Sequence, residues 1–424
     1  MTDGRRDASE LTLPVHPVDF RAGAARRFGV LSPFDGLIVE SVPNTDARVL
    51  AASFSDALRA ADRLHSTEGV QERLRSWARR IDVRREQLAR IISVETGKPI
   101  RFSRVEVEAS LKLLHACCGR QSVRLHREWT PAQAAFSIQN WCDPILTTVS
   151  EAAAVLSSGR ALVIKPSSRA PLASLALAAL WKHGDDLDAL LCVAPSSDAV
   201  GMLRASLTTP RVTEVRFRGS RDVGTFVTRS CQEAAMPVTV FPDQQLPLVL
   251  YALDNVDAQC DAVVNAVLLR PVPSLAERVS CVYVHDHIAD TVIGALCEKL
   301  SQLRVGDPLA DETDIGPVID DVAVALLSDH VEDALFSGAR LPGAHLEIAG
   351  KTIRPLILDE VKPFMRICSE DREGPILPVI RFSDPLELPD TTCLTIQSRL
   401  SKTTEGDCGA ASIRQSAQCA PHLF

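Results

Sequence analysis

Residues 212–224, with the sequence VTEVRFRGSRDVG, have the types and spacing of a phosphate-binding turn. A short run typical of a β-strand leads into Gly219 and Ser220, and a segment compatible with a helix continues past Gly224. The two glycines let the backbone turn sharply and approach a ligand, while the free N–H groups at a helix start attract a phosphate. The same pattern fits a turn that merely packs a helix onto a sheet, and on this stretch alone packing is the slightly stronger interpretation.

A second candidate is Lys165, which follows the apolar run of residues 161–164 and precedes a proline and two serines. Burying a lysine ammonium at the end of a strand costs free energy unless the ammonium has a partner. Lys165 therefore either extends its ammonium to solvent or meets a polar or anionic ligand group, such as a ribose or a phosphate.

The elements that would position these residues alternate between strand and helix. Strand-type runs at residues 161–164, 190–193 and 212–217 are separated by helical segments. This alternation predicts an α/β fold with a parallel, doubly wound sheet.

Upstream segments predict a hairpin and two helices. Residues 28–43, FGVLSPFDGLIVESVP, read as a β-hairpin with Asp-Gly at its turn. The clearest helix spans residues 71–95 and is stopped by a glycine and a proline. Its apolar face is formed by Leu74, Trp77, Ile81, Leu88, Ile91 and Ile92. Another helix covers residues 101–118, where His115 is interpreted as a helix-surface or core histidine rather than a catalyst.

Composition limits the class of protein. The chain has 424 residues, 46% hydrophobic and 24% charged, which is enough for large cores and two or more domains. A net charge of −8 without a long basic run gives no sign of nucleic acid or an anionic membrane as a partner. The longest apolar runs are too short to span a bilayer and the start MTDGRRDASE lacks a signal core, so we expect a cytoplasmic protein. Twelve cysteines without C-x-x-C pairs predict neither a zinc site nor a disulfide framework.

Several motifs together resemble the aldehyde dehydrogenase superfamily, from about Phe28 to Phe382. They are SVETGKP, LVIKPSSRAPL, VRFRGSRDVG, VYVHDHIAD, LRVGDPLADETDIGPVID and EGPILPVIRF, in this order. The resemblance implies a Rossmann-like NAD(P) domain, a second α/β domain that carries a cysteine nucleophile, and an oligomerisation hairpin. In such enzymes a thiolate attacks the aldehyde, a hydride passes to nicotinamide and water hydrolyses the thioester. KPSSRAP and the spacing around VYVHDHI are most similar to lactaldehyde or phosphonoacetaldehyde dehydrogenase-like members.

The resemblance also implies a division of the chain. We expect an N-terminal arm at residues 1–27, the NAD(P)-binding domain at 28–237, an incomplete catalytic-type domain at 238–385 and a divergent tail at 386–424. Within the first domain, residues 119–139 would be a shortened oligomerisation segment. The tail has no clear apolar period, so we expect it to be disordered and to leave the strand in EGPILPVIRF with an unpaired edge. The hairpin and the C-terminal strand of a homo-oligomer therefore look defective.

Most cofactor positions of the family are occupied by compatible residues. Lys165 falls on the lysine that binds the adenosine ribose hydroxyls, and Ser168 replaces a glutamate of many NAD-preferring members. Serine leaves room for a 2′-phosphate, so NAD and NADP are both candidates. The other positions of this set are Gly219, Ser220 and Gly224 at the pyrophosphate and nicotinamide, Trp141 before the oxyanion position, and Asp371 at the nicotinamide ribose.

The positions of the chemistry are replaced. Cys142 stands near the asparagine that would donate to the oxyanion, a loss of about 2.7–4 kcal/mol of transition-state stabilisation by analogy. Phe241 falls on the general-base glutamate and Ala276 on the nucleophilic cysteine. Cys281 is the nearest thiol, and a small apolar residue in a strand is its more natural interpretation.

Three functions compete. The first is a working NAD(P)-dependent aldehyde dehydrogenase with unusual residues, the second a pseudoenzyme that binds a nucleotide or a partner, and the third a decayed, unstable product. Because nucleophile, oxyanion donor and base act as a unit, losing all three predicts an aldehyde dehydrogenase homologue without ordinary catalysis.

Overall fold

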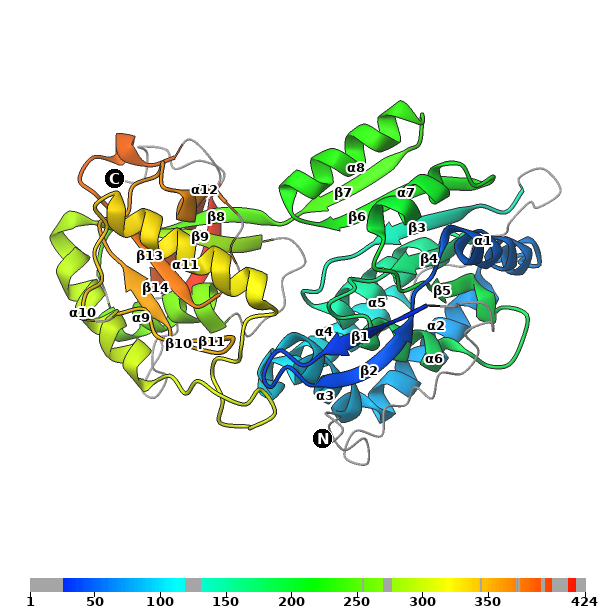
Figure 1. Cartoon of the computed structure of the whole chain (residues 1–424), viewed down its shortest axis with the longest axis horizontal. Coiled ribbons are helices and arrows are strands. Elements are labelled where there is room, and N and C mark those ends of the chain that lie inside the picture. Colours follow the sequence, from blue (N-terminus) through cyan, green and yellow to red (C-terminus); the bar gives the residue numbers. More distant parts are fainter. Residues whose placement is uncertain are drawn as a thin grey trace, which may run out of the picture. The chain divides into compact units, whose positions relative to one another are not determined.

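The computed structural model describes residues 26–118, 131–253, 255–269, 277–343, 345–370, 372, 374–389, 393–398 and 411–416. The chain divides into two compact units, each built around a mainly parallel sheet (Figure 1). Unit 1 comprises Met1–Asp243 and Val272–Ala276, and unit 2 comprises Gln244–Pro271 and Glu277–Phe424. The α/β fold class predicted from the sequence is confirmed.

The sheet of unit 1 has five parallel strands in the order β5-β4-β3-β6-β7. Their bounds are Ala134–Ile138 (β3), Ala161–Lys165 (β4), Leu191–Val193 (β5), Val212–Gly219 (β6) and Val238–Pro242 (β7). The three strand-type runs of the sequence are thus confirmed as β4, β5 and β6. Because β7 pairs with β6, the chain leaves this sheet after Asp243 rather than after residue 237.

The central strand β3 lies in a segment for which the sequence predicted something else. Residues 119–139 were expected to be a shortened oligomerisation segment, but 134–138 pair with both β4 and β6. The five residues AAFSI are all buried, and their apolar content suits a strand covered on both faces. The first part of the segment, 119–130, lies outside the described residues.

Eight α-helices are described in unit 1, besides the short 3-10 helix Asp188–Leu190 (η1). They are Ala47–Asp62 (α1), Glu68–Val83 (α2), Arg85–Thr96 (α3), Ile100–Cys117 (α4), Pro144–Leu156 (α5), Leu172–Trp181 (α6), Ala199–Leu207 (α7) and Arg221–Glu233 (α8). The helix predicted at 71–95 is two helices, α2 and α3, because Arg84 leaves the helical conformation with φ −106° and ψ 14°. Its predicted apolar face is buried, and Gly97 ends α3 with φ 80°. His115 is exposed on α4, as one of its two interpretations required.

The predicted hairpin is confirmed at the start of the described chain. β1 (Arg27–Leu31) pairs antiparallel with β2 (Ile38–Pro43). At the turn, Ser32 N donates to Leu37 O at 2.8 Å, and Gly36 adopts a φ of 72° that glycine accommodates without strain.

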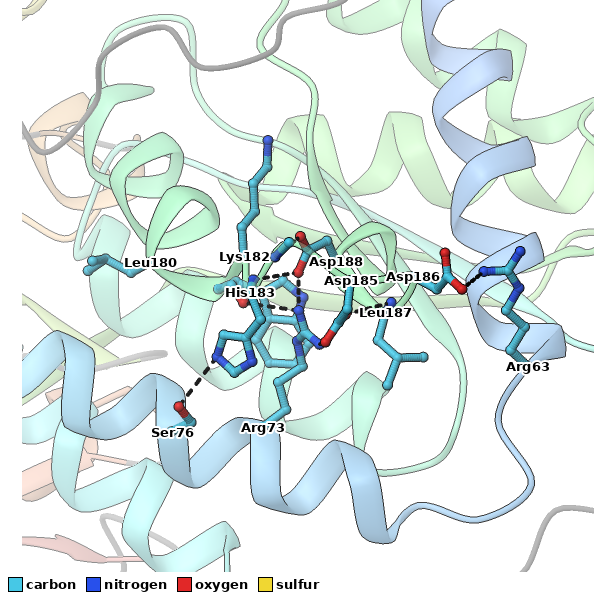
Figure 2. A network of polar contacts seen from close by, with 12 residues as sticks. Arg63, Arg73, Ser76, Leu180, Lys182, His183, Asp185, Asp186, Leu187 and Asp188 are labelled. Atoms are coloured by element: carbon cyan, nitrogen blue, oxygen red, sulfur yellow. Dashed lines mark hydrogen bonds and ion pairs between the residues drawn. The ribbon is translucent and has the colours of Figure 1, made fainter.

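A buried arginine fastens α2 to the loop that follows α6 (Figure 2). The Arg73 side chain is only 4% exposed, and its guanidinium lies 5.0 Å from the Trp181 ring centroid. It donates to both Asp185 oxygens at 2.7 and 2.9 Å and also contacts Asp188. The burial of this cation is therefore balanced by two carboxylates and an aromatic face.

Two buried glutamates bind the starts of α5 and α6. Glu106 of α4 accepts from Ile145 N at 2.8 Å and Leu146 N at 3.3 Å. Glu95 of α3 accepts from Leu172 N at 2.7 Å and Ala173 N at 2.8 Å. Both side chains are fully buried, and they satisfy N–H groups that have no acceptor within their own helix.

Unit 2 has a six-stranded sheet in the order β12-β13-β9-β8-β14-β15, with a separate two-stranded pair β10-β11. The bounds are Gln244–Leu250 (β8), Glu277–His285 (β9), Ile348–Ala349 (β10), Thr352–Ile353 (β11), Leu356–Leu358 (β12), Ile376–Phe382 (β13), Cys393–Ser398 (β14) and Ala411–Ser416 (β15). The helices are Val256–Val264 (α9), Asp286–Gln302 (α10), Asp321–Phe336 (α11) and Arg366–Ser369 (α12). α9 and α10 pack on one face of the sheet and α11 and α12 on the other. In the described part of the chain, no helix is long and apolar enough to cross a membrane.

The expectation for the tail is wrong at two places. β13 is not left with an open edge, because it pairs with β9 and β12, which both precede it in the chain. The tail supplies β14, which pairs parallel with β8 and antiparallel with β15. The physical signal was the short alternation Leu394, Thr395, Ile396, Gln397, which suits a strand with one apolar face. The rest of the tail after residue 389 lies outside the described residues.

The buried carboxyl of Glu95 predicts a pH-dependent stability. Burial, opposed by the two backbone donors, raises its pKa from 4.5 to about 8. Its contribution is therefore complete below pH 4.5 and is lost as the pH rises towards 8, by up to about 1.4 kcal/mol per pH unit. Glu95→Gln should remove this slope from the free energy of unfolding of unit 1.

Tryptophan fluorescence in urea measures this, since all four tryptophans precede Asp243 in the sequence. Glu86→Gln is the matched control, because Glu86 is an exposed glutamate on the same helix α3. An unchanged slope in Glu95→Gln would contradict the assignment.

Candidate functional site

Lys165 ends β4 at the carboxyl edge of the unit 1 sheet and is buried, with 4% of its surface exposed. Its ammonium donates to Pro166 O at 3.0 Å. Burial lowers the pKa of Lys165 to about 8, although Asp198 opposes the shift. Of the two alternatives that the sequence left open, extension to solvent is therefore wrong, and a buried cation remains at this edge.

The glycine turn lies at the same edge, one strand away from Lys165 beyond β3. Ile138 pairs in register with Lys165 on one side and with Phe217 on the other. A Cβ at Gly219 would lie 2.9 Å from the Phe217 ring, and one at Gly224 would lie 3.0 Å from Val240. Close packing alone therefore accounts for glycine at both positions, in agreement with the interpretation of this turn as one that packs a helix onto a sheet. Ser220 is the N-cap residue of α8 and makes no capping bond through its side chain.

The helices that begin at this edge differ in which side chains accept hydrogen bonds from their first N–H groups. The first N–H groups of α5 and α6 donate to Glu106 and Glu95, and Gly201 N of α7 donates to Asp198 at 2.8 Å. At the start of α8 the N-cap Ser220 makes no side-chain capping bond, although Asp222 lies in the first turn of this helix. A phosphate at α8 would therefore displace no side-chain cap, but it would lie near the charge of Asp222.

For the remaining predicted cofactor residues, the structure gives only the exposure of two and does not describe the others. Ser168 is partly exposed in the segment between β4 and α6, and Trp141 is partly exposed just after β3. Asp371 and Ala276 lie outside the described residues. The structure thus brings together Lys165 and the Gly219 turn, and it leaves the roles of Ser168, Trp141, Asp371 and Ala276 as predictions.

Cys142 lies beside an ion cluster that the sequence analysis missed. It is partly buried directly before α5, and its carbonyl accepts from Thr147 Oγ1 at 3.5 Å. The next residue, Asp143, has a left-handed φ of 46° and binds the ammonium of Lys98, which also binds Glu106. No local pattern signals this cluster, because Lys98 pairs with residues 8 and 45 positions away.

Phe241 lies under two arginines of β6. Its ring centroid is 4.5 Å from the Arg218 guanidinium carbon and 5.3 Å from that of Arg216. Arg218 pairs with Phe241 in register and is only 6% exposed. Burial lowers the pKa of Arg218, while Glu151, 3.7 Å away, opposes the shift. The position that the resemblance gives to a general base is thus part of a cation–aromatic stack.

Carboxylates balance the charge of these arginines. Arg216 binds Glu151 and Glu214, the latter at 2.8 Å. Asn140 Nδ2 lies 3.4 Å from Asp243 Oδ2, and Asp243 N donates to Gly219 O at 2.9 Å. We call Arg216, Arg218, Phe241 and Asp243 the arginine cluster. The sequence signal was the pair of arginines in VRFRG, charged residues at the end of an apolar strand.

Cys281 is in the middle of β9 and is buried in the core of unit 2, with 4% of its surface exposed. It is hydrogen-bonded to Cys368, and this bond lowers the pKa of Cys281 and raises that of Cys368. Its interpretation as a small core residue agrees with this burial. No three His, Cys, Asp or Glu side chains of the described residues are arranged to hold a metal ion.

Residues 20–389 match the family model described as the aldehyde dehydrogenase family. The chain belongs to the aldehyde dehydrogenase family. Three similar relatives are a probable NADP-dependent succinate-semialdehyde dehydrogenase of Sinorhizobium fredii, its counterpart in Escherichia coli and a glutarate-semialdehyde dehydrogenase of Pseudomonas aeruginosa. They are 26, 27 and 26% identical and are matched over 86, 85 and 85% of this chain and 77, 78 and 77% of their own length.

Solved structures agree with the fold. An NADP-dependent enzyme of Escherichia coli has a TM-score of 0.76 at 25% identity, covering 85% of this chain and 78% of its own. An aldehyde dehydrogenase of Brucella melitensis has a TM-score of 0.78 at 22% identity, covering 86 and 78%, and this likeness concerns the fold alone. The closer resemblance to lactaldehyde or phosphonoacetaldehyde dehydrogenase-like members stays a prediction.

The burial of Cys281 predicts that its thiol is protected in the folded protein. During brief treatment with N-ethylmaleimide at neutral pH, Cys281 should stay unmodified, while the partly exposed Cys142 reacts. Peptide mass spectrometry measures both sites, and the same treatment in urea, where both should react, is the control. Rapid stoichiometric modification of Cys281 in the folded protein would contradict its assignment as a core residue.

Proposed function

We propose that this member of the aldehyde dehydrogenase family binds NAD or NADP weakly and does not catalyse ordinary aldehyde oxidation. The observation that carries the proposal is Phe241, which lies under Arg218 and Arg216 where the resemblance places the general base. A phenyl ring cannot accept a proton from water. The two guanidinium cations beside it would also disfavour the protonated form of any base placed at this position.

The other chemistry positions support the same conclusion. The resemblance places the nucleophile at Ala276, which has no thiol, and the oxyanion amide near Cys142. Cys281 is a poor replacement nucleophile, because its thiol is buried among apolar residues and hydrogen-bonded to the thiol of Cys368. A relocated nucleophile would also need a new base and a new oxyanion donor at the same place.

The residues at the carboxyl edge of unit 1 fit the nucleotide of the cofactor. The Lys165 ammonium can donate to ribose hydroxyls, and the start of α8 after Ser220 can bind a phosphate. When bound, NAD or NADP supplies the hydride acceptor of the family's reaction. Ser168 leaves room for a 2′-phosphate, which agrees with the two relatives named as NADP-dependent.

Two observations favour a folded binding protein over a decayed product. Both units have contiguous buried cores, and the starts of α5 and α6 are satisfied by buried carboxylates. A cytoplasmic location, the oligomeric state and the aldehyde that an active form would take remain proposals drawn from the sequence. An aldehyde of the semialdehyde type is the class to test, because the relatives above are named for such substrates.

The first test is direct activity. With succinic semialdehyde, lactaldehyde or propanal, NAD(P) reduction should be at least about 10³-fold slower than for the Escherichia coli relative assayed in parallel. Steady reduction that is abolished by Cys281→Ala or Cys142→Ala would contradict the proposal and reveal a relocated nucleophile.

Nucleotide binding gives a second test. Lys165→Ala should weaken NADP binding by about tenfold, because a charged hydrogen-bond donor is removed. Isothermal titration measures the change, and Lys182→Ala, which removes an exposed lysine of the same unit, is the matched control. Wild-type affinities for NAD and NADP should be similar. Tight binding that is unchanged in Lys165→Ala would place the nucleotide elsewhere.

A further inference from the structure

The carboxyl edge of the unit 1 sheet has two unlike halves on either side of β3. Strand order reverses at β3, and in doubly wound sheets ligands bind at the carboxyl ends of the strands where this happens. On the β4 side, the Lys165 ammonium donates to the carbonyl of Pro166 at 3.0 Å. The β6 and β7 side ends instead in the arginine cluster.

The arginine cluster is held from several directions. Arg218 lies over Phe241 and within 3.7 Å of Glu151, and only 6% of its surface is exposed. Glu151 itself is 2% exposed and also binds Arg216. At the end of β7, Asp243 is fixed by its N–H bond to Gly219 O. Moving Arg218 aside would separate buried opposite charges as well as an aromatic contact.

This cluster lies where the reactive half of a dinucleotide would have to bind. The resemblance places the nicotinamide next to the Gly219 turn and the general base at Phe241, and these two residues end neighbouring strands. The nicotinamide ring of the oxidised cofactor carries a positive charge, so Arg218 would repel it, and the ring could not replace the contacts of the guanidinium with Glu151 and Phe241. The adenosine half needs only Lys165 and a phosphate site at the start of α8.

We infer that unit 1 binds the adenosine diphosphate half of the cofactor alone, so that its ligands are adenine nucleoside diphosphates and the nicotinamide riboside stays unbound. This inference rests on the proposed nucleotide site. It changes the expected ligand class from a redox cofactor to a nucleotide that carries no redox group.

Isothermal titration of the full chain with ADP, ADP-ribose and NAD tests the inference. All three should bind with dissociation constants within about twofold of one another, because the added ribose and nicotinamide gain no contacts. Arg218→Thr should tighten NAD relative to ADP by about tenfold, since it removes the side chain that fills the nicotinamide position. Phe241→Ala should act in the same direction, and it leaves the ion pairs of Glu151 in place.

Arg211→Asn is the control, because Arg211 precedes the opposite end of β6, pairs with Asp62 and has a left-handed φ of 63° that asparagine tolerates. It should leave the ratio of NAD to ADP affinity unchanged, and circular dichroism should confirm that every variant is folded. Wild-type binding of NAD at least about tenfold tighter than ADP would overturn the inference and leave the nucleotide site standing. Binding of none of the three ligands would overturn the proposed nucleotide site together with the inference.

Discussion

Buried helix starts need acceptors, and unit 1 supplies two of them from within its own core. Glu95 and Glu106 come from the paired helices α3 and α4 and bind the first N–H groups of α6 and α5. These bonds fix the two helices that follow β4 and β3, and so they fix the edge at which Lys165 ends its strand. They also occupy the positive dipole ends of α5 and α6, which would otherwise attract a phosphate.

Under the function proposed above, the same edge would keep a nucleotide while the reaction is lost. Arg218 and Phe241 are neighbours across β6 and β7, and the Arg218 guanidinium lies 4.5 Å from the centroid of the Phe241 ring. A glutamate restored at 241 would form an ion pair with Arg218 and would act poorly as a base. Recovery of activity by substitution of residue 241 alone is therefore disfavoured.

Much of unit 1 could be predicted because its signals are local. The run ALVIK, the apolar face of residues 71–95 and the Asp-Gly turn each follow from a period or a turn residue. The missed strand β3, AAFSI, contains two alanines and a serine, and the strand β14 of the tail, CLTIQS, is half polar, so neither shows the run of large apolar side chains that marks ALVIK. The site residues that were missed, Arg218 and Glu106, act through contacts with residues 23 and 39 positions away, which no periodicity reports.

The most direct test of the central claim is saturation-transfer difference NMR on NAD bound to the full chain, since it reports which protons of a weak ligand touch the protein. We predict strong saturation of the adenine and adenosine-ribose protons and none above background on the nicotinamide ring. In Arg218→Thr, saturation of the nicotinamide protons should appear. Equal saturation of both rings in the wild-type protein would contradict the claim that the arginine cluster fills the reactive half of the site.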